Sequence, residues 1–395
     1  MNDDRLEIAI HSAGELPAEG PLAHEEPALG SVRVLIVRPG DRVRLANVLD
    51  AVVPAVKTED PAATFPGVLG PADAPVGLGA TAIVEDLAVL PVFDWRGAGY
   101  PEAAELPDAF VDMEGPGARM SPWSRTTNVV LIVEPAPGLP AAEADAAIRR
   151  LALRTARDLA AAAAGSPATA VESFGPVPAG AGPRVGVVLQ VGSEGPLLDT
   201  YLFGRPALGQ SPTVVDPRAI LDGALVSGAY DWAGMRNPTA VYQRSALIRS
   251  LYGRRELTFA GVIVSLGYLD TAEAKRAAAA ATAGLAEELG LDAAVCTTFG
   301  SGNSHTDTML TVRVLERAGV RTVALVAETN GGLTDHVPEA DALISVGNED
   351  ELAPPWVPDV VIGADPPGLA RPVPAGLYLG ALTQTGHHAL TAVPA

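Results

Sequence analysis

One stretch decides the fold, residues 259–328, which read FAGVIVSLGYLDTAEAKRAAAAATAGLAEELGLDAAVCTTFGSGNSHTDTMLTVRVLERAGVRTVALVAE. Apolar runs at 260–265, 291–297 and 321–327 have the length of buried strands, and the segments between them are long enough for helices. Strands that are apolar throughout and alternate with helices are typical of a parallel sheet covered on both faces. The stretch therefore predicts a doubly wound, mostly parallel α/β fold.

The helix boundaries within this stretch are also marked. Residues 270–273 have the Asp-x-x-Glu pattern of a helix start, and Gly290 is expected to end that helix. A second helix is predicted over 304–318, where Ser304 and Asp307 have the spacing of a capping box.

Upstream, the same alternation of apolar runs and helical segments is found. Residues 128–133 are predicted to form a buried strand, 141–164 a long helix and 184–191 a further strand, which together make a βαβ unit. Further strands are predicted at 342–346 and 360–362.

The first 120 residues differ, because they are rich in proline and glycine and contain short β-like runs. We therefore predict three parts: a β-rich, loop-rich N-terminal domain (1–124), a first α/β region (125–254) and a second, Rossmann-like α/β region (255–395).

Composition limits the possible partners. The 395 residues are 48% hydrophobic, which is enough for two or three buried cores, and the formal net charge is -20. Nucleic acids and anionic membranes bind basic surfaces, so this charge argues against both as partners. No apolar run reaches the roughly 20 residues of a membrane span, and the N-terminus lacks the layout of a signal peptide. We expect a cytoplasmic protein.

The single cysteine, Cys296, excludes an internal disulfide and a metal cluster built on cysteines. Its position at the end of an apolar strand predicts a buried, inert side chain.

A glycine-containing loop follows that strand. Gly302, Asn303 and Ser304 precede or begin the predicted helix, whose first N–H groups would suit the carboxylate of a substrate. The Lys-Ser/Thr ending of a nucleotide-binding Walker loop is missing. His305 and Asp307 are candidate catalytic residues or ligands of zinc or another divalent ion, although a capped helix start explains the same residues without a ligand.

Other polar residues have a functional and a structural interpretation. Arg125 has the chemistry to hold a carboxylate through two hydrogen bonds, or to form a structural ion pair. Asp199 and Tyr201 follow a predicted strand, where substrate binding and capping are both open. Asn237 and Thr239 flank a proline, and turn chemistry alone explains such a pair in many proteins.

Several segments occur in the order found in one known family. The chain resembles, over nearly its whole length, the component B proprotein of the glycine/sarcosine/betaine reductases, in segments 38–41, 65–68, 112–117, 121–128, 199–201, 222–228, 236–239, 259–264 and 347–348.

This resemblance implies a self-cleavage site near residues 79–86, where a cysteine of the family becomes a pyruvoyl group. Glu85 stands at the matching position, and a γ-carboxylate cannot leave its own β-carbon to create a ketone. The resemblance therefore implies a chain that stays uncut and carries no pyruvoyl group. Glu85 or Asp86 would instead attract the cation of the substrate.

The resemblance also implies a partner. The family combines with a larger subunit that carries a redox cysteine or selenocysteine, and the complex cleaves a carbon–nitrogen bond of an amino-acid-derived amine reductively. We expect an oxidoreductase subunit in a hetero-oligomer. Two alternatives stay open: a metal-dependent lyase or hydrolase that uses His305 and Asp307, and a non-catalytic scaffold subunit.

Overall fold

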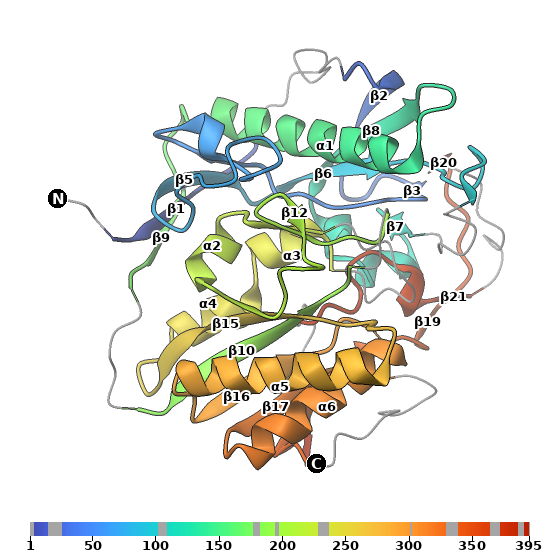
Figure 1. Cartoon of the computed structure of the whole chain (residues 1–395). Coiled ribbons are helices and arrows are strands. Elements are labelled where there is room, and N and C mark those ends of the chain that lie inside the picture. Colours follow the sequence, from blue (N-terminus) through green and yellow to red (C-terminus); the bar gives the residue numbers. More distant parts are fainter. Residues whose placement is uncertain are drawn as a thin grey trace.

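The computed structural model describes residues 4–14, 26–101, 109–176, 182–193, 197–227, 237–300, 302–328, 339–363, 372–385 and the backbone of 391–394. The chain forms a mixed α/β fold, as predicted, with several separate sheets. In Figure 1 the long helix α1 (Ala141–Ala163) lies across the upper part of the molecule, and α5 (Ala272–Glu288) and α6 (Asn303–Arg317) lie along the lower part.

The largest sheet contains the stretch from which the fold was predicted. Its strands, in spatial order, are β13 (Thr213–Val215), β15 (Thr258–Leu266), β10 (Arg184–Val191), β16 (Ala293–Thr297), β17 (Arg321–Glu328), β18 (Ala342–Asn348) and β22 (Thr391–Pro394). The five inner strands run parallel, and the two edge strands are antiparallel to their neighbours. The predicted strands match these bounds to within a few residues.

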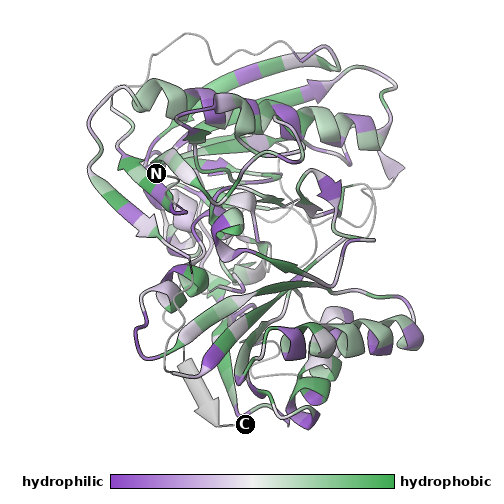
Figure 2. Cartoon of the chain, turned by 60° about the vertical axis from the view of Figure 1, so that its left-hand side comes forward, coloured by the Kyte–Doolittle hydropathy of each residue, from purple (hydrophilic) through white to green (hydrophobic). Residues whose placement is uncertain are grey.

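Helices α5 (Ala272–Glu288) and α6 (Asn303–Arg317) pack against each other and against this sheet. Figure 2 shows hydrophobic residues along the central strands and alternating hydrophilic and hydrophobic residues along the helices. Cys296 is buried beneath them, as predicted, and burial raises the pKa of its thiol to about 12. The doubly wound arrangement itself stays a prediction.

The N-terminal half contains smaller sheets. One has the order β4 (Ala55–Lys57), β5 (Gly79–Val84), β1 (Leu6–His11), β9 (Ala170–Phe174); a second has β2 (Leu29–Val37), β8 (Thr127–Pro135), β6 (Leu87–Val92); a third has β20 (Val360–Ile362), β3 (Val43–Leu45), β7 (Val111–Asp112). Helix α1 packs against strands of the first two sheets, and its buried face includes Ile148, Leu151 and Leu159.

Short elements connect these layers. They are β11 (Tyr201–Leu202), β12 (Arg205–Pro206) and β14 (Leu225–Val226), which form one sheet; β19 (Leu352–Ala353) and β21 (Val373–Pro374), which form another; the helices α2 (Pro217–Leu221), α3 (Thr239–Gln243) and α4 (Ala246–Tyr252); and the 3-10 turns η1 (Pro61–Ala63), η3 (Pro116–Arg119), η4 (Pro122–Arg125) and η5 (Ala375–Leu377).

The predicted βαβ unit around α1 is wrong. β8 pairs with β2 and β6, whereas β10 lies in the seven-stranded sheet. β20 likewise pairs with β3 and not with the main sheet. A strand that is apolar on both faces fits any interior position, so its sequence does not choose its partner. The three-part division stays a prediction, although β8, β9 and β20 pair with strands of the first 124 residues.

A buried ion pair ties the N-terminal half to the middle of the chain. Lys57 Nζ lies 2.5 Å from Asp222 Oδ2, and the same carboxylate accepts hydrogen bonds from Gly77 N and Thr81 Oγ1 at 2.7 and 2.5 Å. Because the Asp222 carboxylate is buried and fully occupied, the pair has the features of a structural link. Within the described ranges, no helix combines the length and hydropathy that crossing a membrane requires.

Candidate functional site

A buried ion pair lies on the inner face of α1. Arg149 Nη2 donates to Asp145 Oδ1 and Oδ2 at 2.9 and 2.8 Å, and the two side chains are 5% and 2% exposed. Residues four apart lie on the same face of a helix, which is why the two side chains meet. Arg149 Nη1 also donates to the carbonyl of Ser227, after β14.

Two of the residues singled out from the sequence lie beside this pair. The guanidinium carbon of Arg149 is 4.7 Å from the ring centroid of Tyr201, a cation–π distance. Burial raises the pKa of the Tyr201 phenol, and Arg149, Asp145 and Asp199 all act on it electrostatically. Asp199 is buried and accepts a hydrogen bond from Ser193 Oγ at 2.7 Å.

A third buried carboxylate, Asp50, faces the same group from the loop after β3. Its two oxygens accept from Thr239 N and Oγ1 at 2.8 and 2.7 Å and from Ala51 N at 2.8 Å. Burial raises the pKa of Asp50 to about 6, while Thr239 and the charge of Arg149 act in the opposite direction. Asp50 therefore titrates near neutral pH, where proton transfer is useful.

These residues, Asp50, Asp145, Arg149, Asp199, Tyr201 and Thr239, form what we call the Arg149 cluster. The cluster combines carboxylates with a guanidinium in a region that is largely closed to water. Opposite charges interact more strongly in such a region than at the surface. A buried cluster of this kind can bind a charged ligand or join the elements that carry it.

The predicted residue Asn237 links the Arg149 cluster to the large sheet. Asn237 Oδ1 accepts from Gln384 N at 2.9 Å, and Gln384 Oε1 accepts from Thr297 Oγ1 at 2.8 Å. Gln384 Nε2 also donates to Tyr242 OH at 3.3 Å. Asn237 is fully buried. Through Gln384 it connects the segment that carries Thr239 to Thr297, the last residue of β16.

The loop after β16 is closely packed. Gln190 accepts from Phe299 N at 2.8 Å and donates to the Ser304 carbonyl at 2.9 Å, which holds both ends of the loop. A side chain at Gly300 would collide with the Tyr268 hydroxyl, which explains why glycine is needed there. Part of the loop therefore has a packing explanation that needs no ligand.

The predicted capping box at the start of α6 is wrong. The helix begins at Asn303, its N-cap is Gly302 at φ +62°, and no side chain caps it. Ser304 is buried inside the helix, and Asp307 accepts from Lys275 Nζ at 2.7 Å and Leu269 N at 3.2 Å. The tertiary contact with Lys275 outweighs the local pattern. The start of α5 is also shifted, because Thr271 and not Asp270 is its N-cap.

His305 is buried close to this contact, on the first turn of α6. In the part of the chain that the structure describes, no group of three or more His, Cys, Asp or Glu side chains is placed to hold a metal ion. The zinc site stays a prediction.

The remaining predicted residues lie elsewhere. Glu85 is exposed at the turn between β5 and β6 and pairs with Arg244. Asp86 Oδ1 accepts from Ala13 N at 2.9 Å. Arg125 is exposed at the end of η4. None of these contacts involves a residue of the Arg149 cluster.

The prediction from sequence missed Asp50, Asp145 and Arg149. One signal was present, because Asp145 and Arg149 are charged residues at helical spacing on the apolar face of an alanine-rich helix. Asp50 gave no comparable signal, since the side chain that binds it, Thr239, is 189 positions away along the chain.

Comparisons with known proteins show which family this chain is similar to. The family model described as glycine/sarcosine/betaine reductase component B subunits matches residues 19–389. The chain is 34% identical over 333 residues to glycine reductase complex component B subunits alpha and beta of Acetoanaerobium sticklandii, which covers 80% of this chain and 75% of that protein.

Relatives named for sarcosine and betaine come from Peptoclostridium acidaminophilum. Identity is 31% over 357 residues with sarcosine reductase complex component B subunit alpha, covering 87% of this chain and 81% of that protein. It is 28% over 363 residues with betaine reductase complex component B subunit alpha, covering 86% and 79%. No solved structure matches.

Proposed function

The chain belongs to the glycine/sarcosine/betaine reductase component B family, and on this basis we propose that it is a subunit of a reductase-like complex that binds a small amino-acid-derived amine without a pyruvoyl group. A larger subunit with a redox cysteine or selenocysteine would be its partner. The observation that carries this proposal is the buried Arg149–Asp145 pair beside Tyr201. Asp199 acts on the same phenol, and Thr239 binds Asp50, on which the charge of Arg149 acts in turn.

The charges of the Arg149 cluster support a zwitterionic ligand. The three relatives are named for glycine, sarcosine and betaine, each of which carries one carboxylate and one cationic nitrogen. Arg149 supplies positive charge for the carboxylate, and Asp199 supplies negative charge for the nitrogen. Charged groups held in a buried site are already oriented before the ligand arrives.

The proposed reaction assigns Asp50 a proton-transfer role. A thiolate or selenolate of the partner would attack the carbon that bears the nitrogen, and the electron pair of the C–N bond would leave with the nitrogen. The cationic nitrogen leaves as a neutral amine, to which Asp50 would then donate a proton. Its pKa of about 6 leaves a usable protonated fraction near neutral pH.

The absence of a pyruvoyl group rests on two positions. Glu85 cannot undergo the elimination that forms the carbonyl, and Cys296 is buried in a central strand with its thiol protonated. Neither residue fits the chemistry of self-cleavage. The proposed binding is therefore noncovalent.

Turnover in a reconstituted complex tests the proposal. With the thiol- or selenol-bearing partner present, Asp199→Asn should lower kcat/KM for the zwitterionic substrate by about tenfold or more, because a buried charge is lost while the Ser193 hydrogen bond is kept. The exposed Glu288→Gln should have no effect.

Three outcomes would contradict this assignment. Full activity of Asp199→Asn would remove the Arg149 cluster from substrate binding. Loss of activity in Glu85→Gln alone would move the cation site to the turn between β5 and β6. Turnover by the partner alone would reduce this chain to a scaffold.

A further inference from the structure

Large hydrophobic side chains are exposed along one short segment, residues 352–360, which we call the apolar strip. Leu352, Val357 and Val360 are 51%, 65% and 51% exposed, and the two prolines between Leu352 and Val357 are exposed as well. Single exposed hydrophobic residues are ordinary on a protein surface, whereas several in one segment are typical of a contact with another protein.

Two arginines hold the apolar strip in place. Arg42 donates through Nη2 to the Val357 carbonyl at 3.2 Å and through Nε to Asp359 Oδ1 at 3.0 Å. The guanidinium carbons of Arg42 and Arg44 lie 5.9 and 5.8 Å from the ring centroid of Trp356, within cation–π distance. The exposed aliphatic side chains are therefore oriented before a partner arrives, which lowers the entropy cost of binding.

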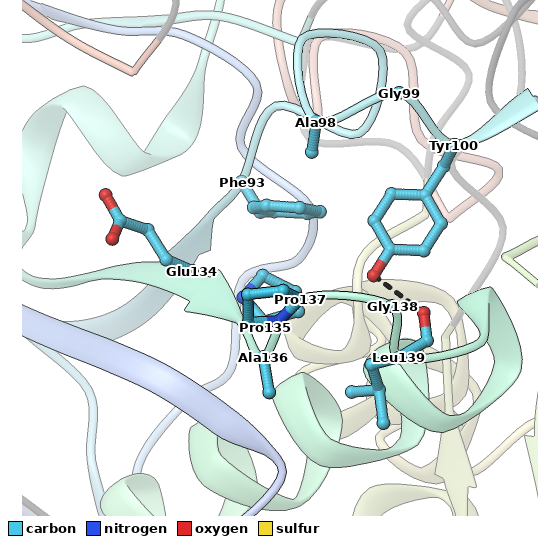
Figure 3. Close-up of a pocket in the computed structure, with 10 residues that line it drawn as sticks. All are labelled: Phe93, Ala98, Gly99, Tyr100, Glu134, Pro135, Ala136, Pro137, Gly138 and Leu139. Atoms are coloured by element: carbon cyan, nitrogen blue, oxygen red, sulfur yellow. Dashed lines mark hydrogen bonds between the residues drawn. The ribbon is translucent and has the colours of Figure 1, made fainter.

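A pocket with apolar walls lies between the loops that follow β6 and β8. It has a volume of about 390 Å³, and Figure 3 shows the rings of Phe93 and Tyr100 on neighbouring walls, with Pro135 beneath Phe93. Tyr100 OH donates to the Leu139 carbonyl at 3.0 Å and so joins the two loops. The Glu134 carboxylate points away from both rings, so the pocket suits an apolar group.

The pocket continues the surface of the apolar strip. β20 ends at Ile362, and a side chain at the following Gly363 would lie 3.2 Å from Val92 Cγ1. Val92 directly precedes Phe93, whose ring lines the pocket. The exposed aliphatic residues and the pocket are thus joined through β20.

The surroundings of the apolar strip are acidic. Asp359 is 68% exposed, and Asp350 and Glu351 precede the strip. Glu351 pairs with Arg119, while Arg42 is shared between Asp359 and a further glutamate. The chain as a whole has a formal net charge of -20. A second copy of the chain would therefore be repelled, and a partner with basic residues around an apolar centre would be attracted.

We propose that the apolar strip and the pocket bind the larger, thiol- or selenol-bearing subunit, through an apolar surface of that subunit with lysine or arginine at its rim. One apolar side chain of the partner would fill the pocket between Phe93 and Tyr100. Protein interfaces have an apolar centre and a polar rim, and a few side chains anchored in pockets supply most of the binding energy. The inference rests on the proposed function, from which it takes the partner. No residue of the strip or the pocket belongs to the Arg149 cluster.

Binding of the full chain to the purified larger subunit, measured by surface plasmon resonance, tests this inference. Val357→Ser and Leu352→Ser should each raise the Kd by about three- to tenfold, because each removes apolar area from the interface. Ala98→Leu should have a similar effect, because Ala98 points toward the ring of Phe93 and a larger side chain there would fill the pocket. The matched control Val171→Ser, at a 59% exposed position on the edge strand β9, should leave the Kd unchanged.

Charge and turnover give two further measurements. Asp359→Asn keeps the oxygen that Arg42 binds but removes the negative charge, so it should lower the association rate by about two- to fivefold at low salt. This difference should disappear at high salt, where exposed charges are screened. At saturating concentrations of the larger subunit, Val357→Ser should keep the wild-type kcat, because Val357 is not part of the Arg149 cluster.

An unchanged Kd for Val357→Ser, or equal weakening by Val171→Ser, would overturn the inference. Self-association of the chain that Val357→Ser abolishes would also overturn it, because the apolar strip would then bind a second copy. If the wild-type chain binds the larger subunit and the strip variants bind equally well, only this inference fails. A wild-type chain that does not bind the larger subunit would contradict the proposed function as well.

Discussion

Arg149→Met is expected to lower the free energy of unfolding by about 3–5 kcal/mol, because it leaves the buried Asp145 carboxylate without its partner. The carbonyl of Ser227 also loses its donor. The double variant Arg149→Met/Asp145→Leu removes both charges and should recover most of this loss, since apolar replacements of a buried ion pair are often neutral or stabilising. Urea denaturation measures both effects.

Turnover measurements distinguish a structural role of the Arg149–Asp145 pair from a role in substrate binding. The stable double variant should still assemble with the partner, yet turnover of the zwitterionic substrate should fall by about a hundredfold or more, because no positive charge remains in the cluster. Arg157→Met breaks the partly exposed pair with Asp158 on the same helix and should cost less than about 1 kcal/mol. A double variant with wild-type turnover would show that the pair is purely structural.

Asp50→Asn is expected to change how stability depends on pH. The pKa of Asp50 rises from 3.8 to about 6 on folding, so the folded state holds its proton more tightly than the unfolded state. Stability from this group is therefore complete below pH 3.8 and is lost as the pH rises through about 6. The full cost at higher pH is on the order of 3 kcal/mol.

The asparagine variant removes this cost and can keep the hydrogen bonds, because Thr239 Oγ1 is able to accept as well as donate. Its free energy of unfolding should exceed that of the wild type at pH 7 and converge with it near pH 4, as urea denaturation across this range would reveal. Turnover should fall by about a hundredfold, because the proton donor is lost. Parallel pH profiles for the two proteins, or unchanged turnover, would contradict the role of Asp50.

The elements that were predictable are those in which sequence pattern and burial agree. Residues 141–164 and 184–191 were placed almost as α1 and β10 lie, because their apolar periodicity is long and uninterrupted. The partner of β8 was not predictable, since apolar residues on both faces suit several positions. At α6, the contact of Asp307 with Lys275 overrides the local capping pattern.

The site was predictable only in part for a similar reason. Tyr201 and Thr239 have visible polar chemistry, and the structure brings both toward Arg149. Arg149 lies with Asp145 on the apolar face of an alanine-rich helix, which indicates a buried ion pair and not its partners elsewhere in the chain. The role proposed for Arg149 depends on Asp50 and Ser227, which are far from it along the chain and interact with it only in the folded protein.

The central claim is that the substrate binds through opposite charges and that the chain carries no pyruvoyl group. The mass of the chain in an active complex tests this claim most directly. A single species at 40.4 kDa that does not react with hydrazine is the predicted result. Two fragments, one of them blocked by a carbonyl that hydrazine labels, would contradict the account.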